Sequence, residues 1–313
     1  MSTERTLRAA AAQLGPIQKA DSRESVIARL LDLMAQARDR GCGFVTFPET
    51  ALTTFFPRWY MEDQEEVDRY FDDEMPNDLT RPLFEFSAAH QIGFYLGYGE
   101  KCVEDGEIHR YNTAILVDRS GTIVGKYRKI HLPGHSEYDT NRKWQHLEKR
   151  YFEVGNLGFP VWETMGGRFG MCICNDRRWP ETFRVMGLQK VELVALGYNT
   201  PVLNSMTDQE SADLRMFHNH LSLQAGAYQN STFVVASAKA GNEDGFEMMG
   251  GSAIVAPTGE IMAVAETVED ELIWADCDFD QCVFGRETIF NFAAHRRPEH
   301  YSRITDQIGS TED

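Results

Sequence analysis

The sequence has too few positive charges for a protein that binds nucleic acid or an anionic membrane surface. Its 313 residues include 31 Lys and Arg against 48 Asp and Glu, which gives a formal net charge of −17 at pH 7. Such a charge repels phosphate backbones and anionic lipid headgroups, because non-specific affinity for them comes from Lys and Arg. We therefore expect neither as a partner. An anionic small molecule would have to be held by a few local arginines.

Long apolar runs are also missing. The chain has no stretch of the ~18 apolar residues that a membrane span needs, and its first segment, MSTERTLRAAAAQLG, lacks the continuous apolar run of a secretory signal. Cysteine is sparse, and the six residues show no framework of the kind found in secreted disulfide-rich domains. We expect reduced thiols and a cytoplasmic protein.

Several motifs that hold cofactors or metals are absent. The sequence contains no GxGxxG, Walker loop, HExxH or GxSxG, so dinucleotide, nucleotide-phosphate, zincin and serine-hydrolase interpretations lose their main support. Cys172 and Cys174 would face the same side of a strand and could suggest a soft-metal pair, but no matching Cys/His pair with zinc spacing accompanies them. We expect no metal and no organic cofactor.

The chain does contain a regular alternation of strand and helix patterns, which predicts an α/β protein with sheets covered by helices. Helices are predicted at 179–188 and 214–229, and another begins at a capping box of Asp21 and Glu24 and ends before Gly41. No linker divides the chain, so we expect one domain over 1–313, with 286–313 as a terminal helix or as an arm that packs on another subunit. The predicted strands lie at 8–14, 44–47, 92–99, 113–118, 122–126, 168–174, 191–197, 232–238, 252–256, 261–265 and 271–276.

Cys174 stands at a predicted junction between a strand and a helix. The strand 168–174 delivers it to the run CNDRRWPE at 174–181, in which the helix begins. Main-chain N–H groups and the positive end of a helix favour a thiolate at such a junction and can stabilise an oxyanion. A buried structural cysteine that ends a core strand is the competing interpretation, and it is the commoner role of a free cysteine.

A cysteine nucleophile needs a base, and the nine histidines show no papain-like pattern. Glu49 directly follows the strand 44–47 and Pro48, and Lys129 lies in the run YRKIHLPGH at 127–135. A glutamate partly desolvated at a strand end could accept the thiol proton, and a nearby lysine could stabilise the resulting negative charge. For each residue taken singly, an ordinary salt bridge at the end of a sheet is the simpler explanation.

Taken together, these segments resemble the nitrilase, or carbon–nitrogen hydrolase, superfamily. Its members use Glu, Lys and Cys in that chain order, which corresponds here to Glu49, Lys129 and Cys174. Within the superfamily the chain resembles the N-carbamoyl-D-amino acid amidohydrolases. That resemblance rests on FPE (47–49), LTTFFPRW (52–59), YRKIHLPGH (127–135), QHLEKRYFE (145–153), CNDRRWPE (174–181), GYNTP (197–201), QAGAYQN (224–230), VAPTGEI (255–261) and IFNF (289–292).

The resemblance implies a four-layer αββα sandwich that assembles as a homo-oligomer, either a dimer or a tetramer. It implies that Cys174 is the nucleophile and that Glu49 is the general base that later activates water. Lys129 would lie beside the tetrahedral intermediate, where the backbone N–H of Asn175 could be a second donor to the oxyanion. Glu148 resembles a carboxylate that orients the substrate, although a surface glutamate paired with a neighbouring cation is the alternative.

Two arginines after the nucleophile suggest an anionic substrate. Arg177 and Arg178 could donate bidentate hydrogen bonds to a carboxylate, a geometry that Lys cannot copy, and one of the two could make a structural ion pair instead. The resemblance also implies that four further residues line the pocket, although structural hydrogen bonds would explain the two histidines equally well. These residues are His131, His146, Asn199 and Thr200.

The implied function is hydrolysis of an N-carbamoyl-D-amino acid to the amino acid, carbon dioxide and ammonia. The preference for the D form comes from the resemblance alone. A 3-ureidopropionate-like substrate or an aliphatic amide, hydrolysed with the same three residues, is an alternative. A binding protein that keeps the fold but has lost catalysis is another.

Overall fold

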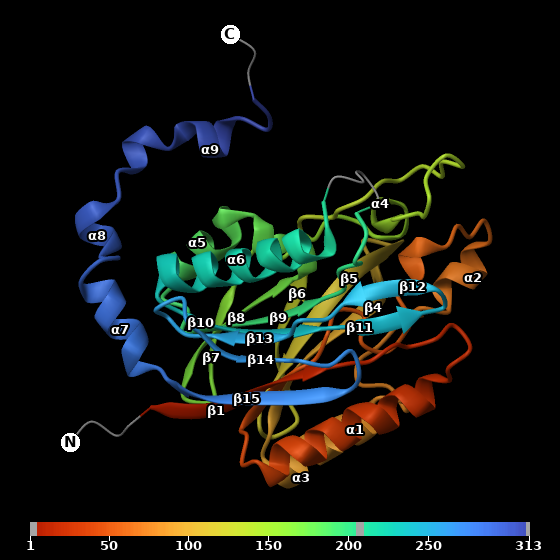
Figure 1. Cartoon of the computed structure of the whole chain (residues 1–313), viewed down its shortest axis with the longest axis horizontal. Helices are drawn as coiled ribbons and strands as arrows, with labels where there is room; N and C mark the ends of the chain where they lie inside the picture. Colours follow the sequence, from red (N-terminus) through yellow and green to blue (C-terminus); the bar gives the residue numbers. More distant parts are fainter. Residues whose placement is uncertain (1–4, 205–209, 311–313) are drawn as a thin grey trace.

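The computed structural model describes residues 5–204 and 210–310, which form four layers in the order helix, sheet, sheet, helix (Figure 1). Helices α1 (Arg23–Asp39) and α3 (Arg81–His90) cover one sheet. Helices α5 (Pro180–Leu188) and α6 (Ala212–Asn230) cover the other. The predicted α/β class and the αββα sandwich are therefore confirmed.

The first sheet has seven strands in the order β15-β1-β2-β4-β5-β6, with β3 paired to β4. Its strands are β1 (Thr6–Gln13), β2 (Phe44–Thr46), β3 (Phe71–Asp72), β4 (Gly93–Glu104), β5 (Glu107–Val117), β6 (Ile123–Arg128) and β15 (Glu271–Asp278).

The second sheet has six strands in the order β14-β13-β10-β9-β8-β7, and β11 and β12 form a separate ribbon. These strands are β7 (Val161–Thr164), β8 (Gly167–Ile173), β9 (Leu193–Tyr198), β10 (Phe233–Ala238), β11 (Ala240–Glu243), β12 (Phe246–Met249), β13 (Ala253–Val255) and β14 (Ile261–Val264).

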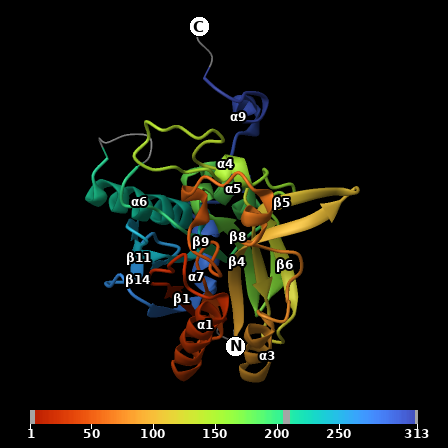
Figure 2. The same cartoon turned by 90° about the vertical axis from the view of Figure 1, so that its right-hand side faces the viewer.

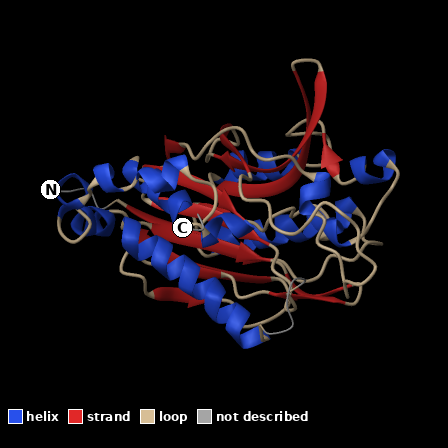
Figure 3. Ribbon diagram, turned by 90° about the horizontal axis from the view of Figure 1, so that it is seen from above, coloured by secondary structure: helices blue, strands red, loops and turns tan. Residues whose placement is uncertain are grey.

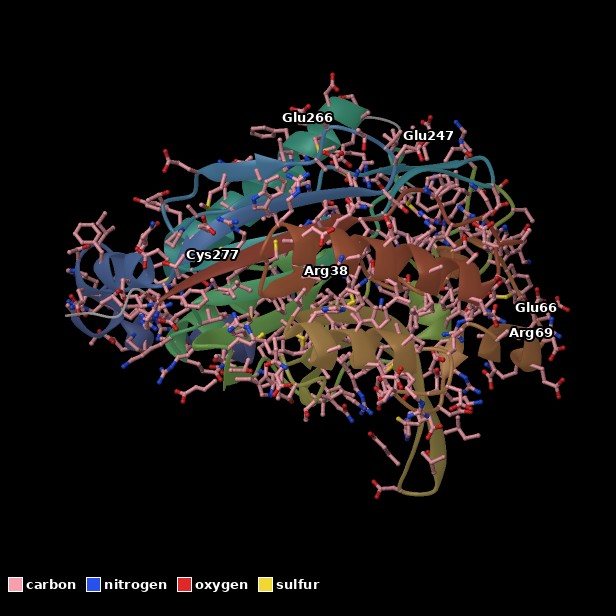
Figure 4. The ribbon with its side chains drawn as sticks, turned by 90° about the horizontal axis from the view of Figure 1, so that it is seen from below. Arg38, Glu66, Arg69, Glu247, Glu266 and Cys277 are labelled. Atoms are coloured by element: carbon pink, nitrogen blue, oxygen red, sulfur yellow. The ribbon has the colours of Figure 1, made fainter. Side chains whose placement is uncertain are left out.

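Strand β1 shows why the layers form. Successive side chains of a strand point to opposite faces, so its alanines divide between two cores. Ala9 and Ala11 belong to the core between the sheets, whereas Ala10 and Ala12 belong to the core that the first sheet shares with α1 and α3. The outer face of these helices is polar, and the exposed Arg38 of α1 lies on it (Figure 4).

The strand directions bring several strand ends to one edge of the sandwich. Strands β1, β2 and β4 are parallel in the first sheet, and β8, β9 and β10 are parallel in the second. Strand β6 runs with β4, because both are antiparallel to β5. A parallel bridge between Leu14 and Lys239 joins the ends of β1 and β10. The carboxyl ends of β2, β6, β8 and β9 therefore meet at this edge.

Short helices occupy several of the connecting loops. These are η1 (Phe56–Arg58), α2 (Gln64–Asp68), α4 (Glu148–Tyr151) and η2 (Cys174–Arg178). Across the described part of the chain, no helix combines the length and apolar character needed to cross a bilayer.

Two local predictions need correction. The N-cap of α1 is Ser22 rather than Asp21, because the Asp21 carboxylate accepts a hydrogen bond from the N–H of Gln18 instead, at 2.8 Å. Strands β4 and β5 also continue beyond the predicted ends into a long hairpin that projects from the body (Figure 3). Its turn, Asp105-Gly106, has positive φ at both residues, as tight hairpins require. The charged sequence of 100–112 hides the alternation on which strand prediction depends.

The C-terminal region leaves the sandwich at α7 (Asp280–Glu287) and continues as three short helical segments along its end (Figures 1 and 2). These are α8 (Phe292–His295), η3 (Pro298–His300) and α9 (Ser302–Asp306), and none contains a buried residue. Its contacts with the body include Phe290 against Tyr228 and Arg184 over Phe292. Of the two alternatives for this region, the exposed chain of short segments resembles an arm rather than one terminal helix, and its packing on another subunit stays a prediction.

Candidate active site

Four ionisable side chains from separate segments meet at the edge where the strand ends converge. Glu49 follows β2, Lys129 follows β6, Glu148 begins α4, and Cys174 follows β8. Glu49, Lys129 and Glu148 are fully buried, and Cys174 is 3% exposed. The structure therefore brings together the three residues that the sequence suggested as nucleophile, base and cation, and it places Glu148, the second carboxylate implied by the resemblance, with them.

Glu49 is held between the two sheets by close backbone packing. A methyl group at Gly97 of β4 or at Gly197 of β9 would overlap the main chain of Pro48 and Glu49. The Glu49 carboxylate accepts hydrogen bonds from the Asn112 amide at 2.7 Å and from the Asn199 N–H at 2.9 Å. The base candidate is thereby fixed on both sides.

Lys129 lies between two carboxylates. Its Nζ donates to Oε1 of Glu49 and to Oε2 of Glu148, each at 2.6 Å. Burial opposes the charge of the ammonium, but Glu148 and Glu49 outweigh burial and raise the pKa of Lys129. Lys129 is therefore a permanent cation at the centre of the cluster.

Glu148 is ionised despite its burial. Burial raises its pKa, but Lys129 and His146 outweigh burial, so that the pKa of Glu148 lies below the ordinary value. The second oxygen of the carboxylate lies 2.9 Å from Nε2 of His146. His146 therefore contacts the cluster through Glu148, and it also lines the cavity described below.

Cys174 has a left-handed backbone conformation, with φ of 48°. Such a conformation costs a non-glycine residue on the order of 1–3 kcal/mol and is maintained only by the surrounding structure. Burial, followed by the charge of Glu49, raises the pKa of the thiol, and Lys129 opposes the shift only in part. This environment therefore disfavours the resting thiolate that the strand–helix junction suggested. The thiol donates toward the carbonyl of Asn199 at 3.6 Å, and a base has to remove its proton before it can attack.

Asp176 fixes the turn that carries Cys174. Its buried carboxylate accepts hydrogen bonds from the hydroxyl of Tyr127 at 2.7 Å and from the N–H groups of Ile173 and His131 at 2.9 and 3.0 Å. Nδ1 of His131 lies 2.8 Å from the same carboxylate. His131 thus supports the turn through Asp176, which agrees with the structural alternative for this histidine.

The two arginines have different environments. Arg177 is 2% exposed and donates to the carbonyl of Cys174 at 2.7 Å and to the hydroxyl of Thr200 at 2.9 Å. Arg178 is exposed and donates to Oδ1 of Asn175 at 3.0 Å, and none of the carboxylates in the described residues lies within ion-pair distance of it. The side chains of Arg177 and Thr200 are thus engaged in structural hydrogen bonds, whereas the exposed guanidinium of Arg178 can bind an anion.

A cavity of about 470 Å³ lies beside the cluster. Its wall includes His146, which contacts Glu148, and Arg178, which contacts Asn175. Arg215 and His218 also line it, and both pair with Glu210, at 2.6 and 2.8 Å. Burial opposes ionisation of Glu210, but its hydrogen-bonding partners lower the pKa to about 2. The remaining lining residues are Pro133, Gly134, Asn204, Leu221 and Ser222.

Three contributors to the site were missed from the sequence. Asn112 binds Glu49 from the middle of β5, Asp176 anchors the turn after Cys174, and Glu210 pairs with two cations of the cavity wall. Asp176 adjoins the nucleophile candidate and could have been suspected from the sequence. Asn112 has no local signal, because its partner Glu49 is distant in the chain. Glu210 precedes its partners Arg215 and His218 by only five and eight residues, so this pairing could have been suspected from the sequence. Asn199 acts mainly through its backbone and through an amide that binds the carbonyl of Glu49 at 3.0 Å.

Comparisons with known proteins agree with this geometry. A family model described as carbon-nitrogen hydrolase matches residues 8–286. A citrullinase from Francisella tularensis is 28% identical over 91% of this chain and 94% of its own. An N-carbamoylputrescine amidase from Arabidopsis thaliana is 32% identical over 66% of this chain and 68% of its own. The crystal structure of a carbon-nitrogen hydrolase from Helicobacter pylori G27 has a TM-score of 0.80 at 21% identity, covering 97% of this chain and 99% of that one, which shows a shared fold.

Proposed function

Since the chain belongs to the carbon–nitrogen hydrolase family, we propose that it hydrolyses the ureido group of N-carbamoyl-D-amino acids. The products are the D-amino acid, carbon dioxide and ammonia, and no metal or organic cofactor takes part. We propose that residues 1–313 act as one domain and that the protein is cytoplasmic, which the sparse cysteines of the sequence support.

In the first half of the reaction, Cys174 is the nucleophile. Glu49 takes the thiol proton as sulfur attacks the ureido carbonyl carbon, and the ammonium of Lys129 and the N–H of Asn175 stabilise the oxyanion. Collapse of this intermediate breaks the bond to the terminal nitrogen, which takes the proton from Glu49 and leaves as ammonia. A carbamoyl thioester remains on Cys174. The raised pKa of the thiol supports a concerted role for Glu49, because a resting thiolate would need no base.

In the second half, water takes the place of ammonia. Glu49 removes a proton from the water molecule, whose oxygen attacks the thioester carbon. The Cys174 sulfur leaves as a thiolate and takes this proton back from Glu49, which regenerates both residues. The released carbamate takes up a proton and loses carbon dioxide, which gives the free amine. Glu148 holds the ammonium of Lys129 together with Glu49 throughout, at 2.6 Å. Lys129 is therefore a fixed electrostatic group rather than a proton donor.

The observation that carries the choice of substrate is the exposed guanidinium of Arg178 on the cavity wall. No described carboxylate neutralises it, and it lies beside Asn175, next to the nucleophile in the chain. A planar guanidinium binds a carboxylate with two parallel hydrogen bonds. An amino acid whose nitrogen bears the carbamoyl group places a carboxylate near the ureido carbon, and the D configuration follows the resemblance to that subfamily.

The named relatives provide the competing substrates. N-carbamoylputrescine carries an ammonium group, which needs an unpaired anion in the pocket. Among the described residues that line the cavity, Glu210 is the one carboxylate, and Arg215 and His218 already pair with it. This arrangement disfavours a cationic substrate. Citrulline, 3-ureidopropionate-like compounds and aliphatic amides remain alternatives for the same catalytic residues.

The test is a turnover assay that measures ammonia release from a panel of substrates. The panel contains the D and L forms of one N-carbamoyl amino acid, 3-ureidopropionate, citrulline, N-carbamoylputrescine and an uncharged amide. We expect the highest kcat/KM for the D-carbamoyl amino acid. Turnover of the amide without turnover of any carbamoyl amino acid would contradict the proposal. Binding without turnover anywhere in the panel would favour a protein of this fold that has lost catalysis.

We also propose that the protein is a homo-oligomer. The outer face of α5 and α6 exposes apolar side chains that a second copy could cover, and the C-terminal region from 286 onward lies beside this face as an exposed arm. The apolar side chains are Val185, Leu188, Leu214, Phe217, Leu221 and Tyr228. Light scattering of the full chain distinguishes a monomer from a dimer or a tetramer.

A further inference from the structure

A second buried cluster of charged side chains contacts the segment that follows Glu49. Lys239 directly follows β10 and Glu243 ends β11, and both side chains are fully buried. Their charged groups are 3.6 Å apart. Arg58 lies 3.9 Å from Glu243 and pairs with Asp244 at 3.1 Å. The cluster therefore contains two cations and two anions, and the reaction proposed above uses none of them.

Both members of the buried pair bind residues 53–58, which we call the bridging segment. Glu243 accepts hydrogen bonds from the N–H of Phe55 at 3.0 Å and from the hydroxyl of Thr54 at 3.2 Å. The ammonium of Lys239 donates to the carbonyl of Thr53. The polar backbone of this segment would otherwise be unsatisfied in the interior, and the ion pair fixes its position.

The bridging segment connects the two carboxylates that hold Lys129. Its amino-terminal side follows Glu49 after three residues. At its other end, the carbonyl of Pro57 accepts a hydrogen bond from the N–H of Leu147 at 2.7 Å, immediately before Glu148. The ring of Phe55 also packs edge-on against His146, with 5.4 Å between centroids, and His146 binds Glu148.

We infer that Lys239 and Glu243 are positioning residues that align Glu49 and Glu148 on either side of Lys129 by anchoring the bridging segment. The inference rests on the proposed function for its kinetic test. Neither Lys239 nor Glu243 is among the described residues that line the cavity beside the cluster, so they act through the segment and not on the substrate. Lys129 depends on the alignment because it donates to both carboxylates, and Cys174 depends on it because both carboxylates act on its thiol electrostatically.

The electrostatics of Lys239 and Glu243 fit a role in anchoring the bridging segment. Burial lowers the pKa of Lys239, and the attraction of Glu243 offsets this only in part. An ammonium held in this way gains its hydrogen bonds only if Thr53 and Glu243 stay in place. Displacement of the segment therefore leaves a buried charge without partners, which is costly, and small displacements are resisted.

The first test is Glu243→Gln, which keeps the shape of the side chain and removes its charge. With the panel substrate that the wild type hydrolyses best, we expect kcat to fall by about 10²-fold, as for a misplacement of about 1 Å at a reacting centre. KM should stay within about twofold, because Arg178 lies on η2 and is not attached to the bridging segment. A rise in KM without a fall in kcat would overturn the inference.

A matched control separates alignment from general loss of stability. Glu192 is a buried carboxylate at the opposite end of the second sheet, where it accepts two hydrogen bonds from Arg5 at 3.0 Å. Glu192→Gln should lower the melting temperature while kcat remains at the wild-type value. If Glu243→Gln behaves in the same way, the pair is structural only and the inference is wrong.

A milder pair of variants covers the case in which Glu243→Gln does not fold. Thr54→Val removes one hydroxyl that binds Glu243, and Thr54→Ser keeps it. We expect a several-fold lower kcat for the valine variant and near-normal kcat for the serine variant. Equal kcat values for the two variants contradict the inference.

The inference can still be tested if the proposed function is wrong. If the wild type hydrolyses no panel substrate, crystal structures of the wild type and of Glu243→Gln provide the test. A longer distance from Lys129 Nζ to Glu148 in the variant than the 2.6 Å of the wild type supports the alignment role. An unchanged distance overturns it.

Discussion

Two fully buried lysines of this protein have opposite electrostatic surroundings. Lys129 contacts two carboxylates at 2.6 Å, and its pKa is raised. Lys239 lies 3.6 Å from one carboxylate and donates to a backbone carbonyl, and its pKa is lowered. Equal burial thus gives opposite shifts, because the number and distance of the anions decide whether the desolvation penalty is overcome.

The charge balance of the two clusters also differs. Glu49, Glu148 and Lys129 carry one more negative charge than positive charge, and a neutral thiol lies next to them. The cluster of Lys239, Arg58, Glu243 and Asp244 is balanced. An excess carboxylate beside a neutral thiol can accept its proton during a reaction, whereas in the second cluster Glu243 and Asp244 are each paired with a cation. The comparison therefore assigns chemistry to the first cluster and support to the second.

Cys174→Ala should give the largest effect and tests the chemical assignment directly. Loss of a covalent nucleophile lowers kcat by about 10⁶-fold in other hydrolases, and we expect a loss of this order in ammonia release. Cys172→Ala is the matched control, because Cys172 is equally buried two residues earlier in β8 and should keep its turnover. Substantial turnover by the Cys174 variant would remove the chemical role from the first cluster.

Lys129→Met and Lys239→Met compare the two clusters in stability. The first substitution leaves two buried carboxylates facing each other and should lower the free energy of unfolding by about 3–5 kcal/mol at neutral pH. The second leaves Glu243 with its hydrogen bonds from Thr54 and Phe55 and with Arg58 at 3.9 Å, so we expect a smaller loss, of about 1–3 kcal/mol. Urea denaturation of both variants measures the difference. Equal losses would show that the two lysines are equivalent.

Arg178→Lys sharpens the distinction between the exposed and the buried arginine. Loss of the planar donor pair should raise KM for a carboxylate-bearing substrate by about tenfold, or about 1.4 kcal/mol, with little change for an uncharged amide. Arg177→Lys should mainly lower the melting temperature, since Arg177 binds the carbonyl of Cys174 and the hydroxyl of Thr200. Equal changes in KM for both substrates would exclude a carboxylate contact at Arg178.

The acid sensitivity of the first cluster gives the smallest expected effect. Because the folded-state pKa of Glu148 is lowered, its contribution to stability is complete above the ordinary glutamate range and is lost as the pH falls through the folded-state value. One proton of difference between the folded and unfolded states corresponds to a slope of about 1.4 kcal/mol per pH unit. As the pH is lowered, the free energy of unfolding of the Glu148→Gln variant should therefore decrease less steeply than that of the wild type. Parallel curves for the two proteins would contradict this.

Prediction from sequence succeeded where the signal was local. Apolar runs at the strand centres predicted nearly all strands of both sheets, and the run at 113–126 predicted an antiparallel pair that the structure contains as β5 and β6. It failed where a contact across the chain outweighed the local pattern. Asp21 caps a turn with Gln18 instead of a helix, and the β4–β5 hairpin continues through a charged stretch.

For the candidate site, the sequence predicted which residues take part but not their ionisation states or exposure. The motifs around Glu49, Lys129 and Cys174 could be compared with a family, and the structure brings these residues together. The state of the thiol could not be predicted, because its pKa depends on burial and on Glu49, and both are properties of the folded chain. The same holds for Arg177 and Arg178, which are neighbours in the sequence and opposites in exposure.

The amino-acid sequence by itself determined the alternation of strands and helices, the excess of negative charge and the identity of the groups that can react, because these depend on residue type and spacing. The tertiary structure alone decided which charges compensate one another. Lys129 and Lys239 are the same type of residue, and each follows the end of a strand. Only the packing of distant carboxylates around them distinguishes the two. It makes Lys129 a permanent cation between two anions and Lys239 an anchor for the bridging segment. Coulombic interactions depend on distance in space and on desolvation, and neither quantity is written in the order of residues along the chain.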